Sequence, residues 1–434
     1  MDKMADVLGR AGAWCGQNKY LSAIKNAFQN FMPLTIAGAI GVLWCNVLVN
    51  ESTGLGIFFK PIMALEFLNP AFQAVNFCTI SCITVGITLG IAQEIGVWNM
   101  GAERAGYIPG LVGLAAWLSV TNTSHMVEGA KEAFTGIAGN ELGATGLFTG
   151  MIIGVLSVEL FCFFEKQDAL KIKMPEQVPP GVARAFEVLV PATITLIITA
   201  CIGSACYNLT GLYLNDVIKN GIQGPLGAVG ATIPGVMIIY LVIMLFWLVG
   251  IHGNNMLSAV KEALFTPLAL ENVEKFNKGE KPTNIINMYF LQMCGEFGGS
   301  GVTIGLVIAI MIFGKREDNK AIATLSLVPG LFNINETVTF GIPMVLNPIL
   351  GIPFVVAPLI TIIIGYVLTV IGFCPVACLT VPWTTPPIVF GFLATGANVM
   401  GAVTQAILIV VSTVIYTPFL ISYEKYQNKQ AAEA

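Results

Sequence analysis

Charged residues are scarce in this sequence, and so are histidines. Asp, Glu, Lys and Arg make up 11% of the chain, against about 25% in soluble proteins. There are two histidines, and the ten cysteines are scattered without a His or carboxylate to complete a metal set. The net charge of −4 is small and dispersed, so the sequence offers no basic surface to nucleic acid. These absences argue against a soluble domain, a metal, a cofactor and a nucleic-acid partner.

Long apolar runs take the place of the missing charges. Hydrophobic residues make up 55% of the chain, and runs of about 20 apolar residues, the length of a helical membrane crossing, recur from end to end. The runs do not alternate polar and apolar residues, which excludes the strands of a membrane barrel. Residues 1–20 have no apolar stretch typical of a removable signal peptide. The sequence therefore predicts an all-α integral membrane protein.

The first half of the chain has a regular pattern. Residues 2–30 have the pattern of an amphipathic helix lying on the membrane surface. We expect spans at residues 31–49, 71–97, 104–121, 144–164, 186–209 and 226–250. The loop between the fourth and fifth spans is rich in Lys and Arg, so the positive-inside rule makes it cytoplasmic, and by alternation the N-terminus as well.

The second half is irregular. The basic loops 271–282 and 315–320 are separated by only about 30 apolar residues, too few for two crossings. Either "KREDNK" (315–320) breaks the positive-inside rule or part of 285–301 is re-entrant. Residues 294–305 are rich in glycine, and prolines recur between 343 and 358. Broken helices of this kind are tolerated where they line a wet cavity, as in transporters. Two clearer spans, 352–373 and 398–422, follow.

A lone carboxylate stands in the most apolar part of the chain. In "GLFNINETVTFG" (330–341), Glu336 is the only Asp, Glu, Lys or Arg between Ala321 and Ser422, and Asn333 and Asn335 flank it. An ionisable group at membrane depth costs at least about 2.5 kcal/mol, so by default it faces a cavity and a partner. The alternative is a structural carboxylate that accepts hydrogen bonds from backbone at a helix break.

Two further motifs place polar or aromatic groups inside apolar surroundings. In "WLVGIHGNNML", His252 lies between two glycines, which indicate a turn that leaves the imidazole accessible for hydrogen bonds or a proton relay; a satisfied core histidine is the alternative. In "VPWTTPP", prolines frame Trp383, whose indole face suits the apolar face of a sugar ring. A tryptophan of the interfacial belt explains this motif equally well.

Two weaker candidates complete the set. Asn140 precedes the fourth span in a loop expected outside, where it reaches a substrate or only caps the loop. Glu296 lies in the glycine-rich run and lines the same cavity or balances a local charge. Carboxylate, amide and aromatic groups without a cationic cluster together suggest a transporter of a neutral polyol.

At these motifs the sequence resembles a known family. It is similar to the membrane-spanning IIC (EIIC) component of bacterial phosphotransferase systems, in the lactose, cellobiose and diacetylchitobiose family. The matching stretches follow the family's order over nearly the whole chain: "AIKNAFQNFMPLTIAGAI" (23–40), "IKMPEQVPPGVARAF", "WLVGIHG", "GGSGVTIGL", "FNINETVTFGIPMVLNP" and "VPWTTPP".

The resemblance implies a fold and a mechanism. The fold would be a homodimer in the plasma membrane with about ten spans, two re-entrant hairpins and both termini cytoplasmic. Residues 1–225 would form a dimerisation half and residues 226–434 a substrate-transport half. A disaccharide would enter from outside and receive a phosphoryl group on its 6-hydroxyl from a phosphorylated IIB partner, itself supplied by a IIA protein.

The resemblance also implies residue roles. Glu336 and His252 would bind the sugar near the hydroxyl to be phosphorylated, with Glu336 as base or as a positioning group. Asn140 would bind another hydroxyl, Trp383 would stack on a ring, and Asn335 would add a polar contact. Glu296 replaces an apolar residue of the relatives, which alters sugar preference or leaves it unchanged. The rival functions are an ion-coupled sugar symporter and a membrane-embedded enzyme with a fixed site.

Overall fold

The computed structural model describes residues 10, 13–14, 17–51, 56, 59–125, 134–175, 177–342 and 344–433. Most of the predicted surface helix before residue 17 lies outside these residues. From Lys19 onward the chain forms one helix, α2 (Lys19–Leu43), which a π-helical turn (Trp44–Leu48) extends. The sequence predicted a surface helix up to residue 30 and a separate span after it. In the structure the two are one continuous helix from Lys19 to Leu48.

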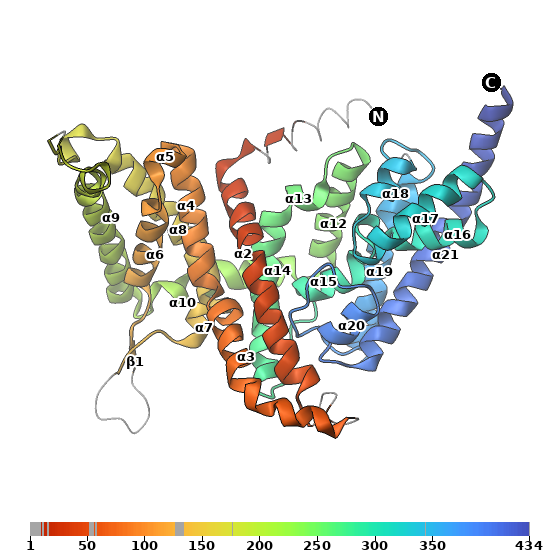
Figure 1. Ribbon diagram of the computed structural model, residues 1–434, viewed down its shortest axis with the longest axis horizontal. Coiled ribbons are helices and arrows are strands. Elements are labelled where there is room, and N and C mark those ends of the chain that lie inside the picture. The colour runs from red at the N-terminus through yellow and green to blue at the C-terminus, as the bar shows by residue number, and fades with distance from the viewer. Residues whose placement is uncertain are drawn as a thin grey trace. The chain divides into compact units, whose positions relative to one another are not determined.

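The described chain is helical apart from one short hairpin, so the all-α prediction is confirmed (Figure 1). It divides into two compact units. We name the first the bundle unit (17–35 and 77–227) and the second the broken-helix unit (mainly 36–76 and 228–434). Residues 36–76 thus group with the C-terminal part of the chain, whereas the sequence assigned them to the N-terminal half. The division of labour into dimerisation and transport halves stays a prediction.

The bundle unit consists of straight helices that lie side by side in Figure 1. Helix α4 packs against α6 and α8, and α6 also packs against α9. The elements are a π-helical turn (Phe77–Ser81), α4 (Ile83–Met100), α5 (Ala102–Ala105), α6 (Ile108–Val120), β1 (Ser124–His125), β2 (Phe134–Thr135), α7 (Gly139–Leu142), α8 (Ala144–Glu165), a 3₁₀ turn (Asp168–Leu170), α9 (Pro180–Thr210), α10 (Leu214–Ile218), a second π-helical turn (Lys219–Gln223) and α11 (Gly224–Gly230), whose last residues belong to the other unit.

Two carboxylates of the bundle unit lie toward the end of α8 and are paired. Lys19 pairs with Glu159 at 2.5 Å. The buried carboxylate of Glu165 pairs with Arg104 at 2.8 Å and with Arg184 at 3.0 Å. Glu159 and Glu165 therefore have their partners within the protein, as structural groups do.

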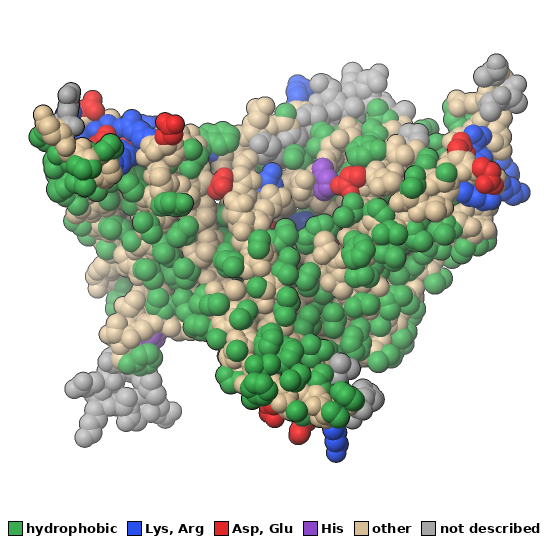
Figure 2. Space-filling model, viewed as in Figure 1, with side chains coloured by type: hydrophobic (Ala, Val, Ile, Leu, Met, Phe, Trp, Pro, Cys, Tyr) green, Lys and Arg blue, Asp and Glu red, His purple; other side chains and the backbone are tan. Residues whose placement is uncertain are grey.

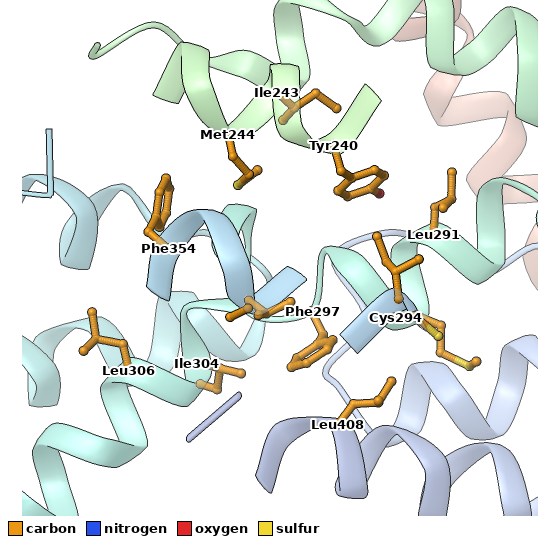
Figure 3. Close-up of a cluster of buried hydrophobic side chains, with 14 of the residues drawn as sticks. Tyr240, Ile243, Met244, Leu291, Cys294, Phe297, Ile304, Leu306, Phe354 and Leu408 are labelled. Atoms are coloured by element: carbon orange, nitrogen blue, oxygen red, sulfur yellow. The ribbon is translucent and has the colours of Figure 1, made fainter. Parts of the chain in front are cut away.

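The broken-helix unit contains more and shorter pieces. They are a 3₁₀ helix (Lys60–Leu68), α3 (Asn69–Asn76), α12 (Ile233–Leu248), α13 (Gly253–Met256), α14 (Ser258–Asn277), α15 (Met288–Gly295), a 3₁₀ turn (Ser300–Val302), α16 (Ile304–Phe313), α17 (Glu317–Leu331), α18 (Glu336–Gly341), α19 (Gly351–Val370), α20 (Val389–Ala394) and α21 (Val399–Glu433). A continuous apolar core joins α12, α15, α16, α19 and α21, and Tyr240, Phe297 and Phe354 are among its largest side chains (Figure 3).

The chain breaks in this unit are satisfied by side chains from α21. A backbone carbonyl freed from its helix needs a donor inside the protein, because lipid supplies none. Tyr416 donates to the carbonyl of Gly301 at 2.8 Å, and Ser412 donates to that of Val302, also at 2.8 Å. Gln405 accepts from the backbone N–H groups of residues 388 and 391 and donates to the carbonyl of residue 293. The break predicted at the glycine-rich run is therefore present and internally bonded.

Helix α14 does not stand out in the apolar pattern, since it carries several charged residues. It leads to the basic loop 278–282, and Phe276 at its end lies against Gly396, just before α21. The other basic loop lies near the far end of α21, where Arg316 donates to Asn428 at 2.7 Å. About 30 residues of helix separate the two contacts, or about 45 Å, which exceeds the roughly 30 Å of hydrocarbon in a bilayer.

The two basic loops thus lie at opposite ends of this unit. Residues 288–313 connect them as one crossing that is bent by 59°, instead of returning to the side from which they came. Of the two alternatives, this arrangement favours the one in which "KREDNK" (315–320) breaks the positive-inside rule, and the side of the membrane on which each loop lies stays a prediction.

Helix length and composition support a polytopic membrane protein. Five helices of the described chain are long and apolar enough to cross a membrane, and two bent pairs raise the number to seven. Shorter apolar helices, Ile108–Val120 and Ile233–Leu248, lie beside them. The predicted total of about ten spans stays a prediction.

Candidate functional site

His252 lies at the turn where α12 ends and α13 begins. Its Nδ1 accepts a hydrogen bond from the backbone N–H of Asn255 at 3.2 Å, which caps α13. A neutral imidazole that accepts at Nδ1 has its proton on Nε2. The ring also packs against Trp247, with the centroids 4.4 Å apart. A Cβ at Gly253 would lie 2.0 Å from the carbonyl oxygen of Ile243, so this tight turn requires glycine.

Glu336 is the first residue of α18 and faces His252. Its Oε1 lies 3.7 Å from His252 Nε2, and the two side chains are 47% and 37% exposed. Figure 2 shows a histidine next to an acidic side chain at the surface of this unit. A separation of 3.7 Å is longer than a hydrogen bond. The two groups are therefore neighbours that do not satisfy each other.

Asn333 joins three separate parts of the chain. Its side-chain oxygen accepts from the backbone N–H of Gly298 at 2.7 Å, and its amide group donates to the carbonyls of Trp383 and Thr385. Its own backbone is left-handed, with φ of 63°, a conformation that asparagine tolerates better than most residues. The bonds fix the Trp383 loop to the glycine-rich turn, and the Trp383 side chain is left 40% exposed.

Asn335 is placed differently from the other predicted ligands. It is 4% exposed, and its amide donates to the carbonyl of Ser300 at 2.8 Å. The side chain of Ser300 in turn accepts from Asn254 at 2.9 Å. This described contact of Asn335 is structural, and the predicted contact between Asn335 and a sugar stays a prediction.

Glu296 follows α15 and is 18% exposed. It forms an ion pair with Lys261 of α14, and the hydroxyl of Tyr240 donates to it at 2.8 Å. It interacts electrostatically with His252, as do Glu336 and Lys261. Glu296 therefore balances a local charge and is also close to the His252 and Glu336 pair.

Asn140 is exposed in α7 and belongs to the bundle unit. The other predicted site residues all belong to the broken-helix unit. The role of Asn140 in a shared site stays a prediction.

The His252 and Glu336 pair has a specific chemical capacity. The imidazole N–H can donate a hydrogen bond to an oxygen, while the carboxylate can accept a hydrogen bond from an O–H group. A single hydroxyl that lies to one side of the pair, within reach of both atoms, can accept from Nε2 and donate to Oε1, which aims its proton at a carboxylate. This is the geometry of a general base beside a reacting hydroxyl. The exposed indole of Trp383 adds an apolar platform in the same unit.

Comparison with known proteins decides the family. Residues 25–358 match the family model described as "Phosphotransferase system, EIIC". The chain belongs to the phosphotransferase system EIIC family. This EIIC chain is therefore a multi-pass membrane component of a sugar phosphotransferase system.

The relatives of this EIIC chain cover nearly its full length. It is 33% identical over 429 residues to the oligo-beta-mannoside-specific EIIC component of Bacillus subtilis (strain 168), with 98% of this chain and 94% of that protein covered. It is 30% identical to the cellobiose-specific EIIC component of Lactococcus lactis subsp. lactis (strain IL1403), with 98% of both covered. The crystal structure of the transporter ChbC, the IIC component from the N,N'-diacetylchitobiose-specific phosphotransferase system, matches with a TM-score of 0.88 at 29% identity, over 97% of each chain.

Sequence reasoning missed three of the residues that build the site. Asn333 was noted only as a neighbour of Glu336, although asparagine before a helix break is a known turn former. Lys261 was not singled out, because it lies in a helix with ordinary charge content. Ser300 is one of several small residues in the glycine-rich run, and no pattern distinguishes it.

Proposed function

We propose that this EIIC protein binds a β-linked disaccharide and carries it across the plasma membrane for phosphorylation at the 6-hydroxyl. The observation that carries the proposal is the pairing of His252 and Glu336 at 3.7 Å, which leaves room for one hydroxyl to bridge them. The names of the relatives, which include a cellobiose-specific component and a diacetylchitobiose-specific transporter, support this substrate class.

In this proposal each residue has one task. His252 donates to the sugar oxygen, and Glu336 accepts its proton or holds the hydroxyl in position. Trp383 stacks on a sugar ring, and Asn140 binds a further hydroxyl from the bundle unit. Asn335 and Asn333 hold the site together. Orientation of a reacting group alone contributes about 7 kcal/mol or more to such steps.

The proposal needs other proteins. The phosphoryl group comes from a phosphorylated IIB partner, with IIA upstream, because the chain itself has no group assigned to carry phosphate. The product is an anion, so phosphorylation traps it inside. We further propose a homodimer with both termini in the cytoplasm.

The test compares Glu336→Gln and His252→Ala with the unaltered protein. We expect both variants to fold, because both side chains are partly exposed, although His252→Ala also removes the cap of α13 and the ring contact with Trp247. Both should lose binding of cellobiose, diacetylchitobiose and lactose by at least tenfold, measured by calorimetry on purified protein. Both should also abolish sugar accumulation in cells that supply phosphorylated IIB.

Two results would contradict the proposal. The first is near-normal binding and uptake in both variants. The second is uptake that continues without a phosphoryl donor and stops when an uncoupler is added, which would favour an ion-coupled symporter.

A further inference from the structure

A second charged pair lies close to the proposed sugar site. Lys261 and Glu296 are 8% and 18% exposed and form an ion pair. The hydroxyl of Tyr240 donates to the same carboxylate, and the Lys261 ammonium lies 5.7 Å from the centroid of the Tyr240 ring. A buried lysine without a partner is costly, so this arrangement explains how α14 carries a cation into the core.

The contacts of Glu296 are unequal on its two oxygens. Both the Lys261 ammonium and the Tyr240 hydroxyl bind Oε1. Among the described residues no hydrogen bond reaches Oε2, and Oε2 is not one of the buried side-chain oxygens that lack a partner. Oε2 is therefore not fully buried, and it is the oxygen of Glu296 that remains for a ligand.

The lysine is the counter-ion of the acid. Glu296 and Glu336 act on the same imidazole, His252, so the two carboxylates belong to one electrostatic neighbourhood. Within it, Lys261 pairs with Glu296, and Glu336 has the imidazole as its neighbour.

We propose that the ion pair with Lys261 orients Glu296 so that Oε2 accepts a hydrogen bond from the sugar, which makes this pair a specificity determinant of the site. The inference rests on the proposed sugar-binding function. Lys261 is a positioning residue in this account, since it acts through Glu296. An ionised carboxylate only accepts hydrogen bonds, so the sugar must offer a hydroxyl or amide N–H at the ring position that faces it.

This hydrogen bond to a charged group should make the site selective. A site built to bind a donor rejects an analogue that lacks it, because the carboxylate then has a hydrogen bond neither to water nor to the ligand. Derivatives with hydrogen or a methoxy group in place of that one hydroxyl should bind roughly ten- to hundredfold more weakly. The same change at positions that face no protein group should have little effect.

The experiment uses the purified full-length protein and a panel of β-linked disaccharides, each with one hydroxyl replaced by hydrogen. In the unaltered protein we expect at least two sensitive positions. At one of these sugar positions, replacement of the hydroxyl should no longer weaken binding in Glu336→Gln. At the other position, it should no longer weaken binding in the double variant Lys261→Met with Glu296→Gln. The double variant removes both charges while keeping both shapes, so it should melt near the wild-type temperature and bind the parent sugar roughly tenfold or more weakly.

Two single changes complete the design. Lys261→Met alone should lower both the melting temperature and the affinity, because Glu296 keeps its charge without a partner. Lys261→Arg retains the cation and should restore the two-position pattern. A purely structural pair would also lose stability in Lys261→Met, but it would not change which hydroxyl matters.

The outcomes separate this inference from the proposed function. If the unaltered protein binds none of the disaccharides, the proposed function fails. If it binds them and the double variant keeps the wild-type affinity and pattern, only the role of Lys261 and Glu296 is overturned. A single sensitive position in the unaltered protein would also overturn it, whether or not the double variant folds.

Discussion

One carboxylate from each unit, Glu165 and Glu336, shows the difference between a paired acid and an available one. In the bundle unit, Glu165 is buried at a helix end and has two arginines as partners. In the broken-helix unit, Glu336 is half exposed and its neighbour is an imidazole that does not reach it. A charge with its own partners stabilises a fold, and a charge without one is available to a ligand. The comparison teaches that the partners of a carboxylate indicate its task better than its position in the sequence.

The two units also differ in how many of their described residues have a left-handed backbone. All described non-glycine residues with positive φ belong to the broken-helix unit: Val302, Asn333, Leu346, Ile388 and Ala397. Left-handed backbone is costly for such residues, above all for the β-branched valine and isoleucine. Strain is thus concentrated in the unit that carries the His252 and Glu336 pair, while the bundle unit is regular.

The largest expected effect comes from adding one methyl group to the broken helix. Gly301 has φ of 79°, and a Cβ there would lie 2.4 Å from the ring of Phe354. Gly301→Ala should therefore lose roughly 2–5 kcal/mol of stability through backbone strain and overpacking. Thermal unfolding in detergent measures this loss, and sugar binding should fall with it.

Gly181→Ala is the matched control in the bundle unit, because nothing lies within 4 Å of its added Cβ. It should leave the melting temperature nearly unchanged. Equal losses in the two variants would remove the contrast between the units.

An intermediate effect is expected at Glu165 in the bundle unit. Glu165→Gln keeps the size of the side chain but removes the buried one of the two carboxylates, Glu165 and Glu187, that Arg104 and Arg184 share. We expect a loss of about 1–3 kcal/mol, less than for a fully buried pair because Arg104 is partly exposed. Sugar affinity measured by calorimetry should stay within about twofold of wild type. A large loss of affinity in a well-folded variant would contradict a purely structural role.

The smallest effect compares two buried serines. Ser412 donates to the freed carbonyl of Val302 in another segment, whereas Ser157 donates to Ile153 in its own helix, where the carbonyl already has a backbone partner. Ser412→Ala should cost about 1 kcal/mol, since it leaves a buried acceptor unsatisfied. Ser157→Ala should be nearly neutral. Melting curves that show the reverse order would contradict the role given to α21.

The sequence predicted the main site residues for a physical reason. A lone carboxylate in an apolar run is expensive, so Glu336 stands out in any scan, and glycines on both sides of His252 indicate the turn that exposes it. The structure places the two side chains 3.7 Å apart, although 84 positions separate residues 252 and 336 in the chain. The glycine-rich break was predicted on the same grounds, as glycine and proline end helices.

The remaining features depend on tertiary contacts that no local pattern records. Val302 and Ile388 are left-handed although β-branched residues avoid that conformation, so local preference points the wrong way there. Helix α14 has ordinary charge content, which hid Lys261. The positive-inside rule does not decide between the two basic loops, because it describes an average over loops rather than each one.

The bonding face of α21 has a consequence for motion. Gln405, Ser412 and Tyr416 are spaced by seven and four residues, so they form one stripe along the helix. The side chains of this stripe form hydrogen bonds to two separate helix interruptions, the glycine-rich turn and the start of α20. Loosening one helix would therefore release both interruptions together. In hydrogen exchange, the amides of these distant segments should open as one cooperative unit, with a shared rate and a shared response to temperature.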